Sequence, residues 1–327
     1  MKLRTSIAAI PPGALDLTGD AVRRRRRFQA DMLEQLERAG YEEIIPPTFE
    51  YAEVFMRAGG PEIADRLIRF LDLDGQLLAL RYDFTATVAR LAATKLSDRK
   101  TPLRLCYAGH VFRQEPGREG RRPREILQVG GEILGESGVA ADIEIVRLAL
   151  ELARSAGAGS QGGELQLNLG HAGALAPALA ALPPEERSAV RRLIDRKDAA
   201  GLAAAANGGA APGRGVLETL PFIIGRSEAL DRAQKLAPKA AEAIERLREI
   251  DAALTPAERR QVVYDFGEVR GLDYYTGIHF EIFVTGAGTA VGAGGRYDDL
   301  VARFGRPLPA VGLALDLDVL AQAGTAP

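Results

Sequence analysis

The fold is decided by residues 125–134, which read EILQVGGEIL. Successive side chains of a β-strand point to opposite faces of its sheet. One face of this stretch is apolar and suits a core: Leu127, Val129, Gly131 and Ile133. The other face carries Gln128, Gly130 and Glu132. An amide and a carboxylate beside a glycine make a floor for a small polar ligand, and the alternative is a solvated sheet face with a glycine bulge.

Further strands and helices are expected on either side of this strand. Residues 103–113 form a second apolar run, and the polar loop 114–124 separates it from the first, which predicts a long hairpin. Apolar residues recur every three or four positions up to Ala39, which predicts a helix over residues 21–39. Similar patterns predict strands at 41–45 and 76–81, and helices at 85–93 and 140–153.

The middle of the chain differs in composition. Residues 170–254 are rich in Ala and helical in pattern, and Pro183-Pro184-Glu185-Glu186 is typical of a helix start. Residues 199–215 are nearly low-complexity Ala and Gly, so we expect a flexible connector there. Helical periodicity resumes over residues 229–254.

Strand patterns return at residues 261–266 and 277–284, and a strand–helix pair follows at 311–320. Strands on both sides of a helical stretch indicate an α+β fold with a helical insertion. We therefore expect three segments: a core at 1–169, the insertion at 170–255 and the rest of the core at 256–327.

Composition and charge exclude several classes of protein. Lys and Arg number 42 and Asp and Glu number 44, so a net charge of −2 gives no general attraction to nucleic acid or an anionic membrane. No apolar run reaches the roughly 18 residues of a membrane span, and residues 7–10 are too few for a signal-peptide core. Cys106 is the single cysteine and the three histidines share no close spacing, which argues against a metal centre. We therefore expect a cytoplasmic protein without a membrane partner, a metal or a cofactor.

A run of five arginines, Arg23–Arg27, lies inside the first predicted helix. Five consecutive residues point all the way round a helix, so they cannot form one basic stripe. The run is interpreted as a solvated helix start balanced by nearby acids, and the alternative is a contact with an anionic partner.

Two glycine-bounded stretches near the end of the chain carry polar side chains. In GEVRGLDYYTG, residues 267–277, an Arg, an Asp and two Tyr lie between glycines. This set suits a zwitterionic ligand, and the alternative is a turn with packed tyrosines. In GGRYDD, residues 294–299, backbone N–H groups could cradle a phosphate, although the Lys-Ser/Thr of a P-loop is missing.

These residues together resemble class II aminoacyl-tRNA synthetases, and histidyl-tRNA synthetases in particular. Phe112-Arg113-Gln114-Glu115, followed by an Arg-rich loop and then Gln128 and Glu132, resembles motif 2 of the class. Arg270-Gly271-Leu272-Asp273-Tyr274-Tyr275 resembles a histidyl signature, and residues 294–298 with 309–312 resemble the approach to motif 3. Residues 40–47 resemble motif 1, whose proline, here Pro47, lies at the dimer interface. The resemblance implies a core of mixed, mainly antiparallel sheet flanked by helices.

The resemblance also implies a histidine-binding pocket. Asp83, Thr85 and Gln128 would face the α-amino group, Glu132 and Tyr275 the imidazole with Tyr274 nearby, and Arg113 and Arg270 the carboxylate. Such a pocket is chemically sensible, because a cationic amine prefers carboxylate and amide acceptors and a carboxylate prefers Arg. Three alternatives stay open: Asp83 as a helix N-cap, Thr85 as a first-turn residue and Arg113 in a structural ion pair.

The chain departs from the synthetases at three places. Val319 stands where motif 3 has the Arg that holds the ATP γ-phosphate, with Asp318 beside it. The chain ends seven residues after Leu320, so we expect no anticodon-binding domain and no tRNA partner. Asp83-Phe84 replaces a Glu-Gly pair, which shortens the acid and adds an aromatic ring. Losing a charge clamp typically costs several kcal/mol of transition-state stabilisation.

A synthetase-like core without the ATP clamp and the tRNA domain resembles the family of ATP phosphoribosyltransferase regulatory subunits. This resemblance implies no catalytic residues, a short-form catalytic subunit as partner, a homodimer core within a hetero-octamer, and feedback by L-histidine in the first step of histidine biosynthesis. Two other hypotheses remain: an enzyme that forms histidyl-adenylate without charging tRNA, and a histidine sensor that acts on some other partner.

Overall fold

The computed structural model describes residues 9–114, 123–155, 164–207, 214–268 and 274–323. Within these residues one large sheet has the strand order β1-β5-β6-β12-β11-β10-β7-β9-β8. Its strands are β1 (Glu42–Glu43), β5 (Leu103–Phe112), β6 (Glu125–Leu134), β12 (Ala310–Asp316), β11 (Gly292–Arg296), β10 (Ile278–Val284), β7 (Leu165–His171), β9 (Val262–Asp265) and β8 (Ile224–Gly225). The pairs β1–β5 and β7–β9 are parallel and the other neighbours are antiparallel. The expected α+β fold with a mixed, mainly antiparallel sheet is thus confirmed.

The predicted hairpin forms the centre of one half of this sheet. β5 and β6 pair along ten residues each, from Leu103 opposite Leu134 to Phe112 opposite Glu125. The first strand of the chain is shorter than expected, because β1 covers only Glu42–Glu43 before the chain turns at Pro46 and Pro47. β6 also pairs with β12 from the far end of the chain, which places residues 310–316 beside the hairpin.

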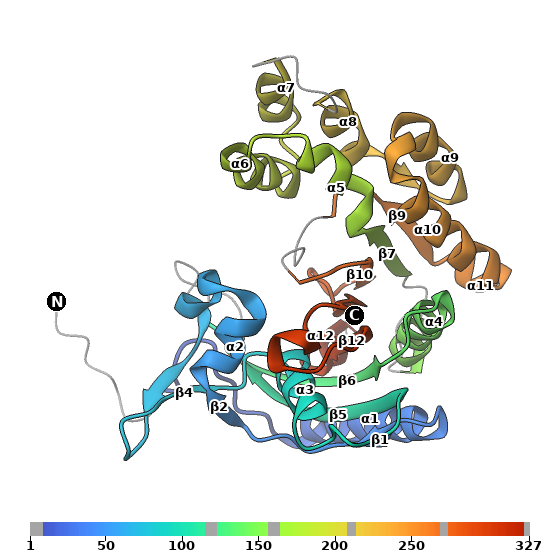
Figure 1. The fold of residues 1–327 in the computed structure, drawn as a ribbon. Coiled ribbons are helices and arrows are strands. Elements are labelled where there is room, and N and C mark those ends of the chain that lie inside the picture. The colour runs from blue at the N-terminus through green and yellow to red at the C-terminus, as the bar shows by residue number, and fades with distance from the viewer. Residues whose placement is uncertain (1–8, 115–122, 156–163, 208–213, 269–273, 324–327) are drawn as a thin grey trace.

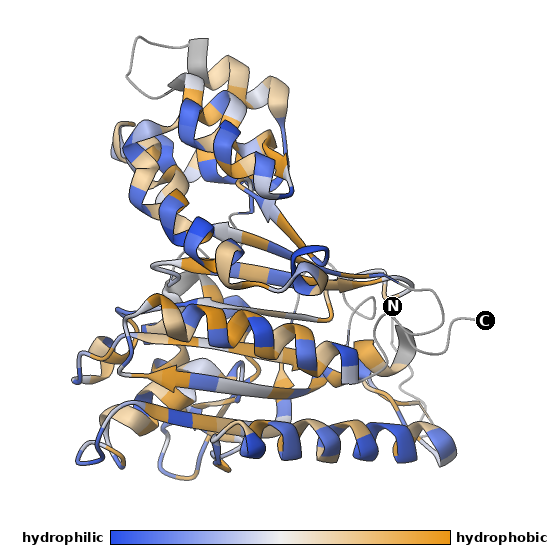
Figure 2. Cartoon of the chain, turned by 90° about the vertical axis from the view of Figure 1, so that its right-hand side faces the viewer, coloured by the Kyte–Doolittle hydropathy of each residue, from blue (hydrophilic) through white to orange (hydrophobic). Residues whose placement is uncertain are grey.

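The two faces of the hairpin carry different layers (Figure 1). Helices α1 (Gly19–Arg38), α4 (Val139–Ser155) and α12 (Leu317–Ala323) cover the face on which Leu127, Val129 and Ile133 are buried, as predicted. Helix α3 (Phe84–Ala93) covers the other face, where Gln128 and Glu132 lie. Figure 2 shows apolar and polar segments alternating along the long helices and strands, as expected for elements with one buried side.

The arginine run in α1 is balanced by acids. Arg23 pairs with Asp20 and the Nε of Arg27 lies 3.6 Å from Asp31, both on the same helix. Arg25 reaches across to Asp318 in α12, with its Nε 3.0 Å from the carboxylate. The interpretation as a balanced helix start therefore fits these contacts.

A small sheet of order β2-β4-β3 lies beside the hairpin. Its strands are β2 (Phe49–Tyr51), β4 (Leu77–Leu80) and β3 (Arg69–Leu71), and helix α2 (Ala52–Gly59) packs on it. Residue Arg81 ties this sheet to the turn at the prolines, because its guanidinium donates to the carbonyls of Pro46 (3.0 Å) and Pro47 (2.9 Å). Pro47 itself is exposed.

The middle of the chain forms a helical layer above the large sheet (Figure 1). Its helices are α5 (Ala172–Ala180), α6 (Pro184–Asp195), α7 (Ala199–Asn207), α8 (Arg214–Thr219), α9 (Ser227–Leu236), α10 (Ala241–Ala253) and α11 (Pro256–Arg259). The expected flexible connector at 199–215 is wrong for residues 199–207, which form α7, and for 214–215, where α8 begins, while residues 208–213 lie outside the described residues. Asp198 accepts the Gly201 N–H at 2.8 Å, Ala is the best helix former, and Leu202 is buried. Among the described residues, no helix is both long and apolar enough to cross a bilayer.

Candidate functional site

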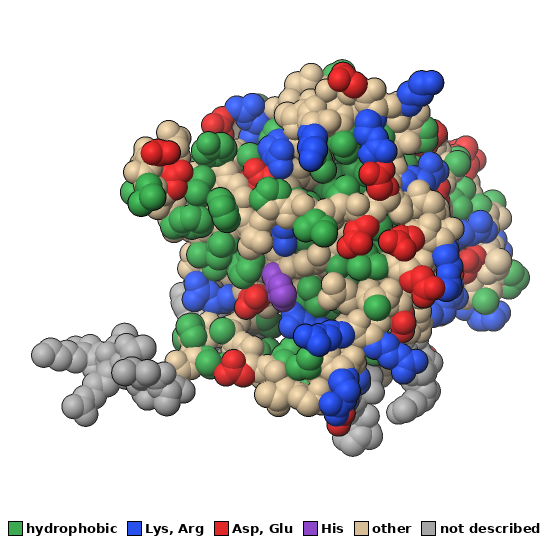
Figure 3. Space-filling model, turned by 90° about the horizontal axis from the view of Figure 1, so that it is seen from below, with side chains coloured by type: hydrophobic (Ala, Val, Ile, Leu, Met, Phe, Trp, Pro, Cys, Tyr) green, Lys and Arg blue, Asp and Glu red, His purple; other side chains and the backbone are tan. Residues whose placement is uncertain are grey.

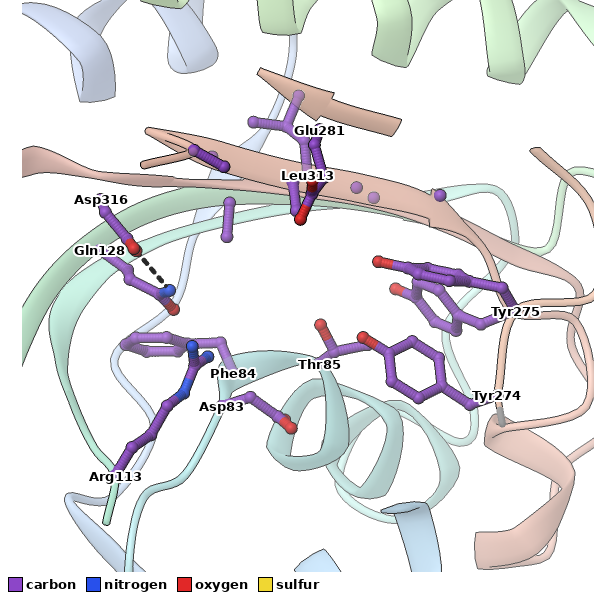
Figure 4. Close-up of a pocket in the computed structure, with 18 of the residues that line it drawn as sticks. Asp83, Phe84, Thr85, Arg113, Gln128, Tyr274, Tyr275, Glu281, Leu313 and Asp316 are labelled. Atoms are coloured by element: carbon purple, nitrogen blue, oxygen red, sulfur yellow. Dashed lines mark hydrogen bonds between the residues drawn. The ribbon is translucent and has the colours of Figure 1, made fainter. Parts of the chain in front are cut away.

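A cavity of about 490 Å³ opens where α3, β6, β10, β11 and β12 meet. Figure 4 shows side chains from segments that lie far apart in the sequence pointing into it. The polar and aromatic residues that line it are Asp83, Phe84, Thr85, Tyr107, Arg113, Gln128, Tyr274, Tyr275, Glu281, Phe283, Thr289, Tyr297 and Asp316. The cavity therefore brings together six of the eight residues expected around a histidine. Of the other two, Glu132 does not line the cavity and Arg270 lies outside the described residues.

The floor of the cavity comes from the central strand. β6 pairs with strands on both of its sides, Gly130 lying opposite Tyr107 and Ala314, and the floor is buried. A side chain at Gly130 would collide with the Leu313 carbonyl oxygen and the Tyr107 ring. The alternative of a solvated face with a glycine bulge is therefore wrong; glycine is needed because two strands and a tyrosine crowd its Cα.

The N-terminus of α3 supplies Asp83 and Thr85. Asp83 is the N-cap of the helix, accepting from the Ala86 N–H at 2.8 Å, as one of its two interpretations had it, and its side chain also lines the cavity. Burial raises the pKa of Asp83, while the Ala86 N–H and Arg113 act against the rise. Thr85 is a first-turn residue whose hydroxyl donates to Glu132 at 3.0 Å.

Glu132 lies behind the wall of the cavity and does not line it. Its side chain is 1% exposed and accepts from Thr85, from Tyr107 at 3.1 Å and from Tyr297. Burial raises its pKa to about 7, against the hydrogen bonds from these three hydroxyls. The expectation that Glu132 faces a ligand imidazole is therefore corrected: strand β12 and the hydroxyl groups enclose its carboxylate, which orients Thr85, Tyr107 and Tyr297.

Phe84 is part of a buried stack under the cavity. Its ring centroid lies 4.0 Å from that of Tyr107 at an interplanar angle of 9°, and the guanidinium of Arg81 lies 4.0 Å from the same ring. Phe84 is 1% exposed. The aromatic ring noted in the sequence thus connects the cavity floor to Arg81, which holds the turn at the two prolines.

Arg113 and two tyrosines close the ends of the cavity. The Arg113 Nε donates to the Tyr82 carbonyl at 3.1 Å, so a backbone contact holds this side chain. The rings of Tyr274 and Tyr275 are 4.6 Å apart, and burial raises the pKa of Tyr275 to about 12. Arg270, expected near the carboxylate of a ligand, lies outside the described residues.

The start of α12 (Leu317–Ala323), directly after β12, holds Val319, the position at which the sequence indicates a lost ATP clamp. Val319 is partly buried against the core, so position 319 belongs to the packing of α12. Asp318 binds Arg25 and accepts the Leu127 N–H at 3.0 Å. Asp316 enters the cavity, and its Oδ1 accepts from the Gln128 amide at 2.7 Å (Figure 4). Burial raises the pKa of Asp316, while Arg113 and Gln128 act against the rise.

Sequence reasoning missed Tyr107, Glu281, Tyr297 and Asp316. A signal for Asp316 was present, because Gly312, Ala314 and Asp316 alternate along one strand and share a face. Tyr107 could have been found from the hairpin register, since it lies opposite Gly130, where a glycine leaves room for an aromatic ring.

The expected phosphate cradle at residues 294–299 is wrong over residues 294–296. These residues belong to β11, which pairs with β10 and β12, so its N–H groups serve the two ladders. Arg296 is buried and its guanidinium lies 2.7 Å from Asp142 of α4. Among the described residues, no group of three or more His, Cys, Asp or Glu side chains is placed to hold a metal ion.

Comparison with known proteins identifies the family to which this fold belongs. A family model described as histidyl-tRNA synthetase matches residues 13–320. The chain is 39% identical to the ATP phosphoribosyltransferase regulatory subunit of Moorella thermoacetica over 97% of this chain and 83% of the relative. It is also 39% identical to the regulatory subunit of Anaeromyxobacter dehalogenans, over 96% of this chain and 91% of the relative.

Two solved structures share the fold. A protein of Bacillus halodurans described as an ATP phosphoribosyltransferase regulatory subunit/histidyl-tRNA synthetase superposes with a TM-score of 0.89 and 28% identity, covering 99% of this chain and 85% of that one. A histidyl-tRNA synthetase of Nostoc has a TM-score of 0.76 and 19% identity, with 97% and 75% coverage. The second likeness concerns the fold alone.

Proposed function

The chain belongs to the histidyl-tRNA synthetase-like family of ATP phosphoribosyltransferase regulatory subunits, and we propose from this premise that it assembles with a short-form catalytic subunit of that enzyme. Within the assembly it shifts the catalytic subunit toward its active state in the first step of histidine biosynthesis and carries no chemistry itself. Its core is residues 1–169 and 256–327, and its insertion is residues 170–255.

The observation that carries the non-catalytic role is the missing cation at position 319. Val319 packs against the core where the synthetases have an Arg, and Asp318 is occupied by Arg25. Among the lining residues that the structure describes, Arg113 is the single cation. A site that activates a tetra-anionic nucleotide needs preorganised positive groups at the far phosphate, and losing one typically costs several kcal/mol in the transition state.

The cavity is the proposed site of L-histidine. Asp83 and Gln128 offer acceptors to an α-ammonium group, and Arg113 offers donors to a carboxylate. Tyr274 and Tyr275 line the far side. Feedback through this pocket requires that histidine bind the active and inactive assemblies differently, usually by ~1–3 kcal/mol.

An exposed apolar surface supports the proposed homodimer. It surrounds the small sheet and the turn before it, and it consists of Ile45, Phe49, Tyr51, Phe70, Leu71, Leu73 and Leu77. Figure 3 shows apolar side chains gathered over one part of this underside of the molecule. Large exposed apolar patches mark interaction sites, and Pro47 lies next to this one. Sedimentation of a Leu71→Lys variant tests it: a dimeric parent and a dissociated variant support the dimer, and equal sedimentation coefficients argue against it.

The decisive experiment mixes the purified chain with a short-form catalytic subunit and measures phosphoribosyl transfer and complex size. We expect turnover above that of the catalytic subunit alone and a co-eluting complex, with a hetero-octameric mass by light scattering. An Arg113→Ala variant should still activate but lose inhibition by histidine. Its matched control is Arg154→Ala, an exposed arginine outside the cavity, which should retain both properties. Unchanged turnover together with the absence of a complex would end the proposal.

The second candidate is an enzyme that forms histidyl-adenylate. Arg113 in the cavity and the match to the histidyl-tRNA synthetase family favour it. Pyrophosphate exchange with ATP and histidine separates the two functions. Exchange at synthetase-like rates would establish the enzyme, and none would leave the regulatory role.

A further inference from the structure

Asp316 is the last residue of β12, and its side chain points into the cavity (Figure 4). Strand pairing places it directly opposite Gln128 of β6. Its Oδ1 accepts from the Gln128 Nε2 at 2.7 Å. The two side chains therefore form one unit on the cavity floor.

This hydrogen bond decides how the Gln128 amide is turned. The Gln128 NH2 group is the donor in this bond and the Asp316 carboxylate the acceptor, so the NH2 end of the amide faces Asp316. The amide oxygen then faces away from Asp316, on the side of Arg113 and Phe84 in Figure 4. A ligand group that meets Gln128 in the cavity must be a donor.

The charges around the cavity favour the same class of ligand. Three carboxylates line it, from Asp83, Glu281 and Asp316, against the Arg113 guanidinium among the described lining residues. The charge of Arg113 acts on both Asp83 and Asp316, so these two carboxylates already offset it. Because carboxyl groups outnumber cations among the described lining residues, this lining favours a protonated amine over a triphosphate.

We propose that Asp316 is a positioning residue that turns the Gln128 carbonyl toward the cavity, so that the pocket selects ligands with a protonated amine and rejects nucleoside triphosphates. The inference rests on the proposed function, since it concerns the pocket assigned there to histidine. It adds a residue that decides which chemistry the pocket accepts.

Calorimetric titration of the full chain, without a catalytic subunit, tests this inference. The probes are L-histidine, histamine, the deaminated analogue imidazole-propionate and magnesium-ATP. The parent should bind histidine and histamine, bind the deaminated analogue at least roughly tenfold more weakly, and bind no ATP. Asp316→Asn should weaken both amines roughly tenfold and allow ATP to bind, because the charge and the fixed amide orientation are lost.

Two further variants separate positioning from a general structural role. The double variant Gln128→Glu with Asp316→Asn moves the carboxylate from position 316 to position 128. Because a carboxylate again faces the cavity, this variant should restore amine binding. Asp98→Asn removes the same charge at an exposed position and should change no affinity. A thermal melt of each variant checks that it is folded.

Three outcomes would overturn the inference: equal amine affinity in the parent and Asp316→Asn, ATP binding by the parent as tight as by Asp316→Asn, or a parent that binds neither amine. None of them bears on the proposed activation of the catalytic subunit, which is measured separately without histidine. Failure of that activation with the binding pattern intact would instead count against the proposed function.

Discussion

The carboxyl group of Glu132 is placed so that its neutral form is favoured, and replacing it with an amide makes this measurable. The side chain is 1% exposed, and hydroxyls of Thr85, Tyr107 and Tyr297 surround it. Burial raises its pKa from the ordinary 4.5 to about 7, even though these hydroxyls donate to it. The substitution is Glu132→Gln, which keeps the shape and removes the titration.

The direction in which stability changes with pH follows from proton linkage. The pKa of Glu132 is higher in the folded than in the unfolded chain, so the folded state binds more protons between these values. The resulting stabilisation is complete below the unfolded pKa and is lost as the pH rises through about 7. At about 1.4 kcal/mol per pKa unit the whole loss is about 3 kcal/mol, of which about 2 to 3 kcal/mol falls between about pH 5 and about pH 8.

Urea unfolding of the parent and Glu132→Gln at one protein concentration measures this effect. The difference in unfolding free energy should move by about 2 to 3 kcal/mol in favour of the variant from about pH 5 to about pH 8. Glu249→Gln, at an exposed helix position, is the control and should show a constant difference from the parent. A constant difference for Glu132→Gln as well would refute the reasoning that burial of this carboxyl dominates its titration.

Three other substitutions test contacts that stabilise the fold around the cavity and the helical layer. Asp142→Ala should lower the unfolding free energy by about 3 kcal/mol, because it leaves Arg296 buried without its 2.7 Å partner; denaturant unfolding measures this. Lys197→Ala removes the 2.8 Å ion pair to Asp265 between the helical layer and β9, and should cost about 1–2 kcal/mol in thermal unfolding. Phe84→Ala should cost about 3–5 kcal/mol in denaturant unfolding, since it empties a fully buried aromatic site; a cost below 1 kcal/mol would contradict the observed stack.

Local patterns predicted the elements of the core well. The two strands of the hairpin, the helix over residues 21–39 and the strand–helix pair near the end all form as expected, because each alternation or helical period is a property of consecutive residues. The flexible connector is a wrong prediction over residues 199–207, because high helix propensity and the cap at Asp198 outweigh the low-complexity composition there. The phosphate cradle failed for a different reason: a glycine-rich stretch is also what a crowded central strand requires.

The sequence by itself determined the α+β class, the family, and the placing of Gln128 and Glu132 on the polar face of one strand, since these depend on residues that are close along the chain or on motifs that can be read directly. Only the tertiary structure decided which of the two lines the cavity. Strand β12, nearly two hundred residues beyond β6, brings Asp316 onto Gln128 and helps to enclose Glu132. Burial and charge pairing depend on strand order and register between distant segments, and no local pattern encodes these.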